Sequence, residues 1–296
     1  MTTAAAAPFR FFSLRVARTR RLGPSLVRVT FTGADLRAFH SEGRDQSLSL
    51  FLPHPGQSAP VVPVELGDGW WQGWRDLPDD VRAVMRSYTL RALRRNPDEI
   101  DIDFVLHGVE PGSAAPAGPA SRWASTAAAG DRVLLLGPAV RDNRAIRFRP
   151  PEDCDLVVLW GDETAVPAAC AIIESLPPGV RVRAWLEVRH PGDIQDLKTR
   201  ADAEITWLVR GEAPHDTEGG RAPSAPEALR AARLPAARAP YAWIAGESGQ
   251  VKELRRHLVD ERGIDRRHVT FVGYWRRGLS EEELREQDER SLRKVC

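Results

Sequence analysis

The sequence predicts a two-domain β plus α/β chain, in which an antiparallel β-barrel is followed by a domain with a parallel sheet. Its 296 residues are enough for two domains of ordinary size. Apolar and polar residues alternate with a period of two in the first half, whereas apolar strands alternate with helical segments in the second. Pro150 and Pro151 interrupt both patterns, so we place the domains at residues 1–149 and 150–296.

Six short segments of the first half have the alternation expected of strands with one buried face. They are Phe9–Val16, Leu26–Thr32, Ser47–Leu52, Ser87–Arg91, Ile100–His107 and Arg132–Leu136. Many short strands separated by turns are typical of an antiparallel barrel, which is the architecture we expect here.

The second half begins with a continuous apolar strand, Asp155–Trp160, and a segment with helical spacing, Thr164–Leu176. The strands expected after it are Arg181–Val188, Glu204–Arg210, Tyr241–Ala245 and His268–Tyr274, and the helices are Pro226–Arg233, Gly249–Arg262 and Ser280–Arg290. This alternation predicts a parallel sheet covered on both faces. Two segments rich in Gly, Pro and Ala, 111–118 and 211–225, are expected to be loops.

Composition excludes several classes of function. The 42 Lys and Arg residues against 41 Asp and Glu give a net charge of +1, which does not indicate a nucleic-acid partner. The longest apolar runs are shorter than the roughly 20 residues of a spanning helix, so we expect no membrane insertion. The N-terminus lacks a basic and then apolar leader, and we expect a cytoplasmic protein. Cys154, Cys170 and Cys296 form no Cys-x-x-Cys pair, and no metal site is expected.

The first motif is Arg86–Arg91, on an expected barrel strand. In a strand, Arg86 and Tyr88 share one face and Ser87 and Thr89 the other. A guanidinium that can grip a pyrophosphate, beside a phenol ring that can pack on an isoalloxazine, suits a flavin dinucleotide. Ordinary cross-strand packing is the alternative explanation.

The second motif combines a strand that contains Val105 and ends at His107 with a helix that begins after Gly118. Ser121 is a candidate cap for this helix, whose N-terminus would present free amides and a positive dipole end to a pyrophosphate. The alternatives are a His that is simply satisfied at a strand end and an ordinary capped helix with a buried Trp123.

Two further motifs, Trp160–Ala168 and Trp243–Ser248, run from a strand through a turn into a helix. The carboxyl ends of parallel strands are where such sheets bind dinucleotides, and Gly246 would let the backbone approach a ligand. Neither is a Gly-x-Gly-x-x-Gly fingerprint, and both can be ordinary turns. A last motif, Gly273–Gly278, follows the final strand and can equally be a solvated basic turn with an aromatic anchor.

Taken in order, these motifs resemble the siderophore-interacting protein family, the FAD-dependent ferric-siderophore reductases. The motifs are Arg-x-Tyr-Thr-x-Arg, Asp-Phe-Val-Leu-His-Gly, Gly-Pro-Ala-x-x-Trp-Ala, Gly-Asp-Glu-Thr-Ala-x-Pro-Ala, Ala-Gly-Glu and Tyr-Trp-Arg-x-Gly. The similarity extends from about Phe9 to about Gly278 and includes the Trp-rich stretch Trp70–Arg75.

The resemblance implies an FAD-binding barrel followed by a nicotinamide-binding α/β domain, as in ferredoxin reductases. The implied flavin contacts are Arg86, Ser87, Tyr88, Thr89, Val105, His107, Gly118, Ala120, Ser121 and Trp123. The implied contacts on the nicotinamide side are Asp162, Glu163, Thr164, Ala165, Gly246 and Glu247. Trp275 is expected to close over the flavin or the nicotinamide.

One strand departs from the family pattern. Where the family typically has His-x-Lys, the strand 45–51 carries serines, so a lysine is missing near Ser49. A lysine would suit an anionic iron chelate, and its absence puts that binding mode in doubt. Arg75, Arg276 and Arg277 are the candidate substitutes for substrate binding.

The expected function is electron transfer from NAD(P)H through FAD to an iron(III)-siderophore, with release of iron(II), by a monomeric enzyme whose flavin, and not a side chain, is the catalytic group. Two alternatives are a flavin reductase that feeds a protein acceptor and a non-catalytic siderophore- or flavin-binding protein. NADPH is the expected coenzyme because Arg189 and His190 can meet a 2′-phosphate, although NADH is possible because Glu187 can serve a free ribose.

Overall fold

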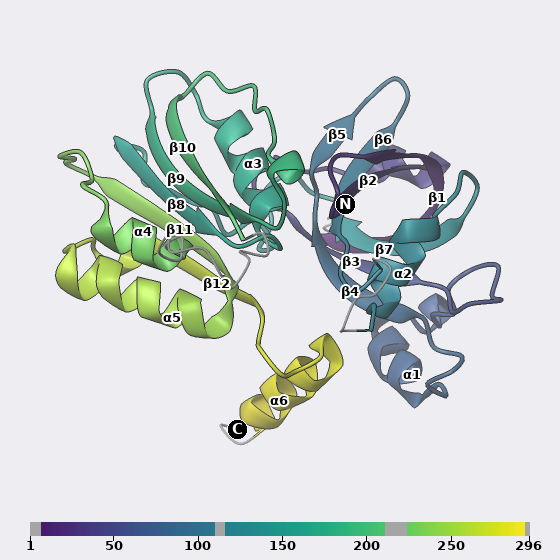
Figure 1. The fold of residues 1–296 in the computed structure, drawn as a ribbon. Helices are drawn as coiled ribbons and strands as arrows, with labels where there is room; N and C mark the ends of the chain where they lie inside the picture. The colour runs from purple at the N-terminus through teal and green to yellow at the C-terminus, as the bar shows by residue number, and fades with distance from the viewer. Residues whose placement is uncertain (1–6, 110–115, 211–223, 294–296) are drawn as a thin grey trace, which may run out of the picture. The chain divides into compact units, whose positions relative to one another are not determined.

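The computed structural model describes residues 7–109, 116–210 and 224–293. The chain divides into two compact units, one ending at Arg147 and the other beginning at Phe148, and each has its own hydrophobic core (Figure 1). Most of the two expected loops, 111–118 and 211–225, lies outside the described residues.

The first unit is built on a curled antiparallel sheet of seven strands in the order β4-β3-β7-β1-β2-β6-β5 (Figure 1). Its strands are β1 (Phe9–Arg21), β2 (Leu26–Thr32), β3 (Ser47–Leu52), β4 (Val84–Thr89), β5 (Ala92–Arg94), β6 (Glu99–Val105) and β7 (Arg132–Pro138). The antiparallel β architecture expected from the alternation is confirmed, and β5 is a strand that the sequence did not indicate.

The curl of this sheet is closed by two consecutive residues that join its edge strands. The amide of Leu90 donates to Gln46 O at 2.9 Å, just before β3, and the amide of Arg91 donates to Asp101 O of β6, also at 2.9 Å. The chain therefore leaves the β3 side of the sheet and joins the β6 side between these two positions. For this reason the strand expected at 87–91 is wrong at its end, and β4 stops at Thr89.

The core of the first unit follows the period of two. Phe12, Leu14 and Val16 of β1 point inward, together with the corresponding apolar residues of β2 and β6. Helix α2 (Pro119–Thr126) packs against β2, β4 and β6. Helix α1 (Trp70–Asp76), which follows the 3₁₀ turn η2 (Val64–Gly69), covers a second cluster that includes Phe51, Trp74 and Met85. A further 3₁₀ turn, η1 (Ala34–Ala38), follows β2.

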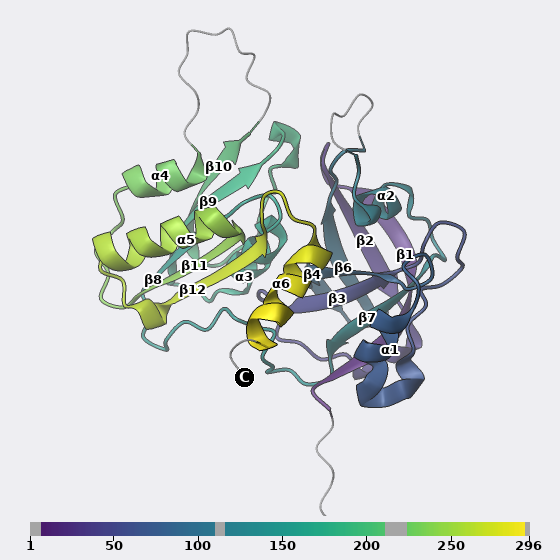
Figure 2. The same cartoon turned by 90° about the horizontal axis from the view of Figure 1, so that it is seen from below.

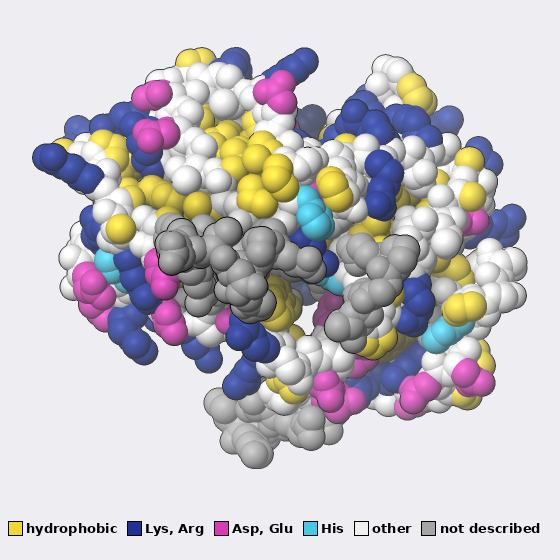
Figure 3. Space-filling view, viewed as in Figure 1, with side chains coloured by type: hydrophobic (Ala, Val, Ile, Leu, Met, Phe, Trp, Pro, Cys, Tyr) yellow, Lys and Arg dark blue, Asp and Glu magenta, His cyan; other side chains and the backbone are white. Residues whose placement is uncertain are grey.

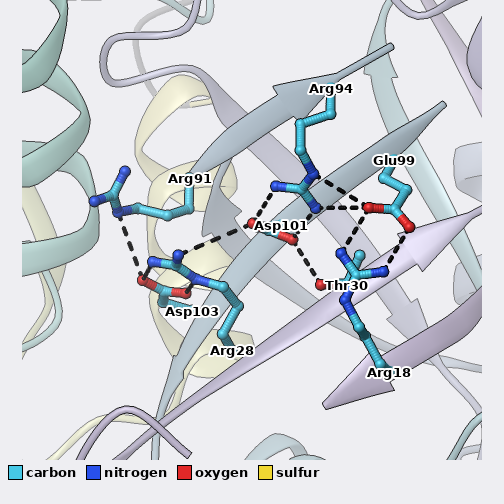
Figure 4. Close-up of polar contacts among 8 residues, drawn as sticks. All are labelled: Arg18, Arg28, Thr30, Arg91, Arg94, Glu99, Asp101 and Asp103. Carbon is cyan, nitrogen blue, oxygen red and sulfur yellow. Dashed lines mark hydrogen bonds and ion pairs between the residues drawn. The ribbon is translucent and has the colours of Figure 1, made fainter. Parts of the chain in front are cut away.

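The outer face of β6 carries a charge ladder, which we define as the carboxylates Glu99, Asp101 and Asp103 with the side chains that pair with them (Figure 4). Their partners are Arg18, Arg28, Thr30, Arg91 and Arg94. Each carboxylate alternates with a core residue and is itself buried. Burial opposes ionisation of Asp101, but hydrogen bonds from Arg94 and Thr30 outweigh it and hold the pKa of Asp101 below its ordinary value.

The second unit is built on a five-stranded parallel sheet in the order β10-β9-β8-β11-β12, which confirms the expected architecture. Its strands are β8 (Leu156–Gly161), β9 (Arg181–Val188), β10 (Asp202–Val209), β11 (Pro240–Glu247) and β12 (Val269–Trp275). Its helices are α3 (Val166–Ser175), α4 (Ala225–Ala231), α5 (Ser248–Arg256) and α6 (Glu281–Arg293), with short turns η3 (Pro191–Asp193), η4 (His257–Glu261) and η5 (Arg266–His268). Helix α3 packs on one face of the sheet, and α4 and α5 pack on the other (Figures 1 and 2).

None of the described helices is both long enough and apolar enough to cross a membrane. Within the described ranges no three His, Cys, Asp or Glu side chains come together as a metal site. Both Lys and Arg and Asp and Glu side chains appear on the visible face (Figure 3).

Candidate functional site

In the first unit, the expected cap of α2 is wrong. Gly118 is the residue before the helix, and no side chain caps it. Ser121 lies inside the first turn, where its hydroxyl accepts from the His107 amide at 3.1 Å and donates to Val105 O at 3.3 Å. Because it sits at the third helical position, its side chain points to the end of β6 and not back to the helix start. Ser121 therefore ties α2 to the end of β6.

The first turn of α2 leaves backbone groups without helical partners. Pro119 has no N–H, and the first helical bond runs from the Arg122 amide to Gly118 O at 3.0 Å, so the amides of Ala120 and Ser121 have no acceptor within the helix. Gly118 has a φ of −65°, which any residue can adopt, and a Cβ added there would meet nothing within 4 Å. The fold itself does not require glycine at this position. A bare backbone beside two such amides fits the pyrophosphate of a dinucleotide.

The Arg86–Thr89 segment lies on β4, next to this turn. Strand register places Arg86 and Tyr88 opposite Leu50 and Leu48, on the face that bears the core, while Ser87 is exposed and Thr89 is buried on the other face. Arg86 Nη1 donates to the Met85 carbonyl at 2.8 Å.

Aromatic rings connect β4, β6 and α2. The half-buried Tyr88 ring lies 4.4 Å from that of Phe104, the Phe104 ring lies 5.8 Å from that of Trp123, and Trp123 stacks on Phe31 at 6.2 Å, all between ring centroids. Helix α2 packs against both β4 and β6, so the structure brings the expected flavin residues of the three elements together. Trp123 contributes to this cluster by packing its ring against Phe31 and Phe104.

Ser49, near which the family typically has a lysine, lies beside the Arg86–Thr89 segment. Ser49 pairs directly with Ser87 across β3 and β4. Phe51 and Met85, on the same face, pack in the cluster covered by α1. Arg75 belongs to α1, and its Cζ lies 6.0 Å from the centroid of the Trp71 ring. Arg75 is therefore on the side of the sheet where the lysine is missing.

In the second unit, Asp162 follows β8, and its carboxylate bonds the residues that end β11 and β12. It is only 3% exposed, and its carboxylate accepts four hydrogen bonds. Oδ1 accepts from the amide and hydroxyl of Thr164 at 3.0 and 2.6 Å, and Oδ2 accepts from the Glu247 amide at 2.8 Å and from Trp275 Nε1 at 2.7 Å. The structure thus brings together Asp162, Thr164 and Glu247, which were expected on the nicotinamide side, and Trp275, which was expected to close over the flavin or the nicotinamide.

The Asp162 carboxylate requires glycine at position 246. The φ of Gly246 is +141°, and a Cβ there would lie 2.5 Å from the Asp162 carboxyl carbon. Glu247 caps α5, because its Oε2 accepts from the amides of Gly249 and Gln250 at 2.7 and 2.9 Å. Burial opposes ionisation of Glu247, but backbone hydrogen bonds outweigh it and keep the pKa of Glu247 below its ordinary value.

Two ion pairs lie where β8, β9 and β10 end. Glu163 Oε1 is 3.3 Å from Arg189 Nη2, and the Glu187 carboxylate pairs with Arg210 Nε. Burial raises the pKa of Glu163, and the neighbouring Asp162 charge adds to this. Glu187 is buried, and its carboxylate pairs with Arg210.

Arg210 is a charged residue of this edge that was not expected from the sequence. The signal was present, because Arg210 follows β10 as Arg189 follows β9, at the same edge of a parallel sheet. Ala165 is fully buried and precedes α3. Arg276 and Arg277 are exposed, and the Arg277 amide donates to Glu247 Oε1 at 3.3 Å. Arg75 lies in the first unit, and Arg276 and Arg277 lie in the second.

Comparison with known proteins gives matches along both units. Residues 15–142 match the siderophore-interacting FAD-binding domain, and residues 154–278 match the siderophore-interacting protein domain. The chain is 30% identical over 275 residues to the ferric vibriobactin reductase ViuB of Vibrio cholerae, covering 93% of this chain and 92% of that protein. It is 30% identical to the NADPH-dependent ferric-chelate reductase of Escherichia coli over 273 residues, covering 90% and 93%.

Solved structures of similar fold agree with these family matches. The siderophore-interacting protein SipS of Aeromonas hydrophila has a TM-score of 0.70 and 31% identity, covering 96% of this chain and 98% of that one. The ferredoxin reductase of carbazole 1,9a-dioxygenase shares the fold, with a TM-score of 0.60 at 17% identity, covering 92% and 71%. The resemblance and the architecture expected from the motifs are both confirmed. This chain belongs to the siderophore-interacting protein family.

Proposed function

We propose that this protein is a ferric-siderophore reductase that uses FAD and NADPH and releases iron as iron(II). The observation that carries the proposal is the similarity, over nearly the full length of each chain, to proteins named as a ferric vibriobactin reductase and an NADPH-dependent ferric-chelate reductase. The chemistry that FAD supplies when bound is the conversion of a two-electron hydride transfer into one-electron transfers. The iron(III) chelate is the substrate, and iron(II), with less charge, is held less tightly by hard oxygen ligands.

In the first unit, FAD is held between β4, the end of β6 and the first turn of α2. Arg86 would neutralise the pyrophosphate, and the amides of Ala120 and Ser121, which lack acceptors within the helix, would donate to its oxygens. Tyr88, supported from behind by Phe104, provides an aromatic surface for the ring system. The complete proposed set is Arg86, Ser87, Tyr88, Thr89, Val105, His107, Gly118, Ala120, Ser121 and Trp123.

In the second unit, the carboxyl edge of the sheet holds the nicotinamide coenzyme. The proposed set is Asp162, Glu163, Thr164, Ala165, Gly246, Glu247 and Trp275, of which Asp162, Gly246 and Glu247 act by shaping the edge. Arg189 favours NADPH, because it follows β9 at this edge and can meet a 2′-phosphate. The pairing of Glu187 with Arg210 supports the same choice, since a paired carboxylate is a poor partner for a free ribose.

The iron chelate is proposed to bind through positive charge and not through iron ligands. The described residues contain no metal-ligating cluster, and reduction at a flavin requires none. Arg75, Arg276 and Arg277 are the proposed cations for an anionic chelate. We also propose that the protein acts as a monomer in the cytoplasm, where NADPH is supplied; gel filtration and cell fractionation test these two points.

Purified protein loaded with FAD tests the function. Under anaerobic conditions NADPH should bleach the flavin absorbance, and a ferric hydroxamate or catecholate should restore it while iron(II) appears with a colorimetric chelator. Flavin that stays oxidised under excess NADPH and NADH would overturn the proposal and favour a binding protein. Recovery with a protein acceptor but with no ferric chelate would favour a flavin reductase.

A pair of glycine variants tests the FAD site. Gly118→Glu adds bulk and negative charge at the first turn of α2, where a Cβ meets nothing, so we expect unchanged folding and FAD affinity weakened at least 10-fold. Gly69→Glu is the matched control, because Gly69 is also exposed with a negative φ of −80°. Equal FAD dissociation constants for both variants, measured by flavin fluorescence, would remove α2 from the site.

A further inference from the structure

We propose that Asp162 is a positioning residue that holds the indole ring of Trp275 in one orientation, so that Trp275 is a fixed wall of the coenzyme site and not a swinging gate. The coenzyme part of this inference rests on the proposed function. The positioning itself rests only on contacts within the second unit.

The hydrogen bond between the two residues is of a strong kind. Trp275 Nε1 donates to Asp162 Oδ2 at 2.7 Å, and Asp162 is 3% exposed. An indole N–H bonded to a buried carboxylate gains the strength of a charge-assisted bond, with little competition from water. Swinging the ring away would leave a buried carboxylate oxygen short of a donor, which is unfavourable.

Two local features let Trp275 reach Asp162, although β11 lies between their strands. The pairing of β11 with β12 shifts register after Gly246, so that Glu247 is opposite Trp275 and Tyr274 is the extra residue. Such a bulge re-aims the side chain that follows it. Gly246 has no side chain, and a Cβ there would collide with the Asp162 carboxylate. The contact therefore crosses the end of β11 over a bare backbone.

The backbone of Trp275 is held as well. Its carbonyl accepts from Ser248 Oγ at 2.9 Å. Ser248 can approach the Trp275 carbonyl because residue 273 is glycine. A Cβ at position 273 would lie only 2.4 Å from the Ser248 hydroxyl. The ring and the backbone of Trp275 are thus bonded to two different elements, the end of β8 and the start of α5.

The same carboxylate also sets the start of α5. Asp162 Oδ2 accepts from the Glu247 amide, and Glu247 in turn caps α5. The indole ring and the first turn of α5 are therefore positioned by one oxygen atom. A half-buried aromatic ring that is already ordered lowers the entropic cost of stacking a planar group of the coenzyme against it.

Nuclear magnetic resonance of the FAD-loaded protein tests the positioning. The chain has nine tryptophans, and the indole N–H signal that disappears in Trp275→Phe identifies Trp275. We expect this signal to be shifted downfield and to exchange with solvent at least 10-fold more slowly than the indoles of the other half-buried tryptophans. Asp162→Asn should move it upfield and accelerate its exchange at least 10-fold. Asp193→Asn is the matched control, because Asp193 is 1% exposed in the same unit and bonds the His190 amide.

Each outcome decides the matter. Rapid indole exchange of Trp275 in the wild type overturns the proposal, and this result stands even if Asp162→Asn does not fold. A Trp275 signal that Asp162→Asn leaves in place, or that Asp193→Asn moves equally, assigns Asp162 a merely structural role. In kinetics, Asp162→Asn should raise KM for NADPH at least 5-fold and change kcat less. Absent reductase activity in the wild type, together with a protected indole, would overturn the proposed function and leave the positioning intact.

Discussion

Replacing Asp101 with alanine should destabilise the first unit by about 3 kcal/mol, which would make the charge ladder on β6 a principal support of that unit. Asp101 lies at the centre of the ladder, with its side chain 5% exposed (Figure 4). It accepts from Thr30 Oγ1 at 2.7 Å and from two nitrogens of Arg94 at 2.6 and 2.7 Å. Its removal therefore leaves donors of two strands without their acceptor.

The magnitude follows from what each donor loses. Thr30 is buried, and a buried hydroxyl left without a partner costs about 1–3 kcal/mol. Arg94 is 39% exposed and keeps Glu99, so its loss is discounted to about 1 kcal/mol. Arg28 keeps Asp103 and adds little. If the unpaired hydroxyl dominates, the double variant Thr30→Val with Asp101→Ala should recover part of the loss.

Urea unfolding at low ionic strength, followed by tryptophan fluorescence, measures the effect without screening the charges. Hydrogen exchange of a peptide covering Glu99–Val105 localises it to β6. Asp79→Ala is the control, because Asp79 also lies 2.6 Å from its partner Arg82 but is 89% exposed, and it should cost less than about 0.5 kcal/mol. Equal losses for Asp101→Ala and Asp79→Ala would refute the reasoning.

The ladder also predicts a pH dependence. The pKa of Asp101 is lowered in the folded state, so its contribution is present above the ordinary carboxyl pKa of about 3.9 and is lost as the pH falls through the lowered value. The difference between wild type and Asp101→Ala should therefore shrink below about pH 4. A difference that stays constant into strong acid would contradict this.

Two further predictions concern the second unit. Gly246→Ala combines a φ of +141° with a Cβ 2.5 Å from Asp162, so we expect thermal unfolding to show a free energy of unfolding lower by about 3 kcal/mol or more. Gly179→Ala, whose φ is +87° and whose Cβ would meet nothing within 4 Å, should lower it by about 1–2 kcal/mol. Similar losses for the two variants would disprove the collision. Burial raises the pKa of Glu163, so its contribution to stability is present below the ordinary carboxyl pKa and is lost as the pH rises through the raised value. Glu163→Gln should flatten the dependence of the melting temperature on pH above the ordinary carboxyl pKa of about 4.3, and an unchanged profile would contradict the raised pKa of Glu163.

Several elements could be predicted because one residue pattern dominates them. Strands β2, β3 and β9 have the bounds that the alternation and the apolar runs indicated. Helix α1 was not foreseen because it has only seven residues, although Trp70, Trp71 and Trp74 have the spacing of one helix face and pack in the cluster with Phe51 and Met85. The end of β4 was misplaced because Leu90 and Arg91 bond to different strands, which no local pattern reveals.

The candidate site, like the fold, could be predicted from the sequence only in part. The order and spacing of the motifs indicated which segments come to the ends of the strands, and the FAD and coenzyme contacts stay predictions. The roles within those segments depend on neighbours distant in sequence. Ser121 was expected to cap α2 but bonds the end of β6. Gly246 makes room for the Asp162 carboxylate, a role that its local sequence did not indicate.

The sequence by itself determined the two architectures, the order of the motifs and the family, because periodicity and motif order are properties of the chain alone. Only the tertiary structure decided that the curled sheet closes at Leu90 and Arg91, that β6 carries a buried charge ladder, and that Asp162 joins Glu247 to Trp275. The physical reason is register. Which donors meet one carboxylate depends on how strands far apart in sequence align, and a single bulge or a missing Cβ changes that alignment.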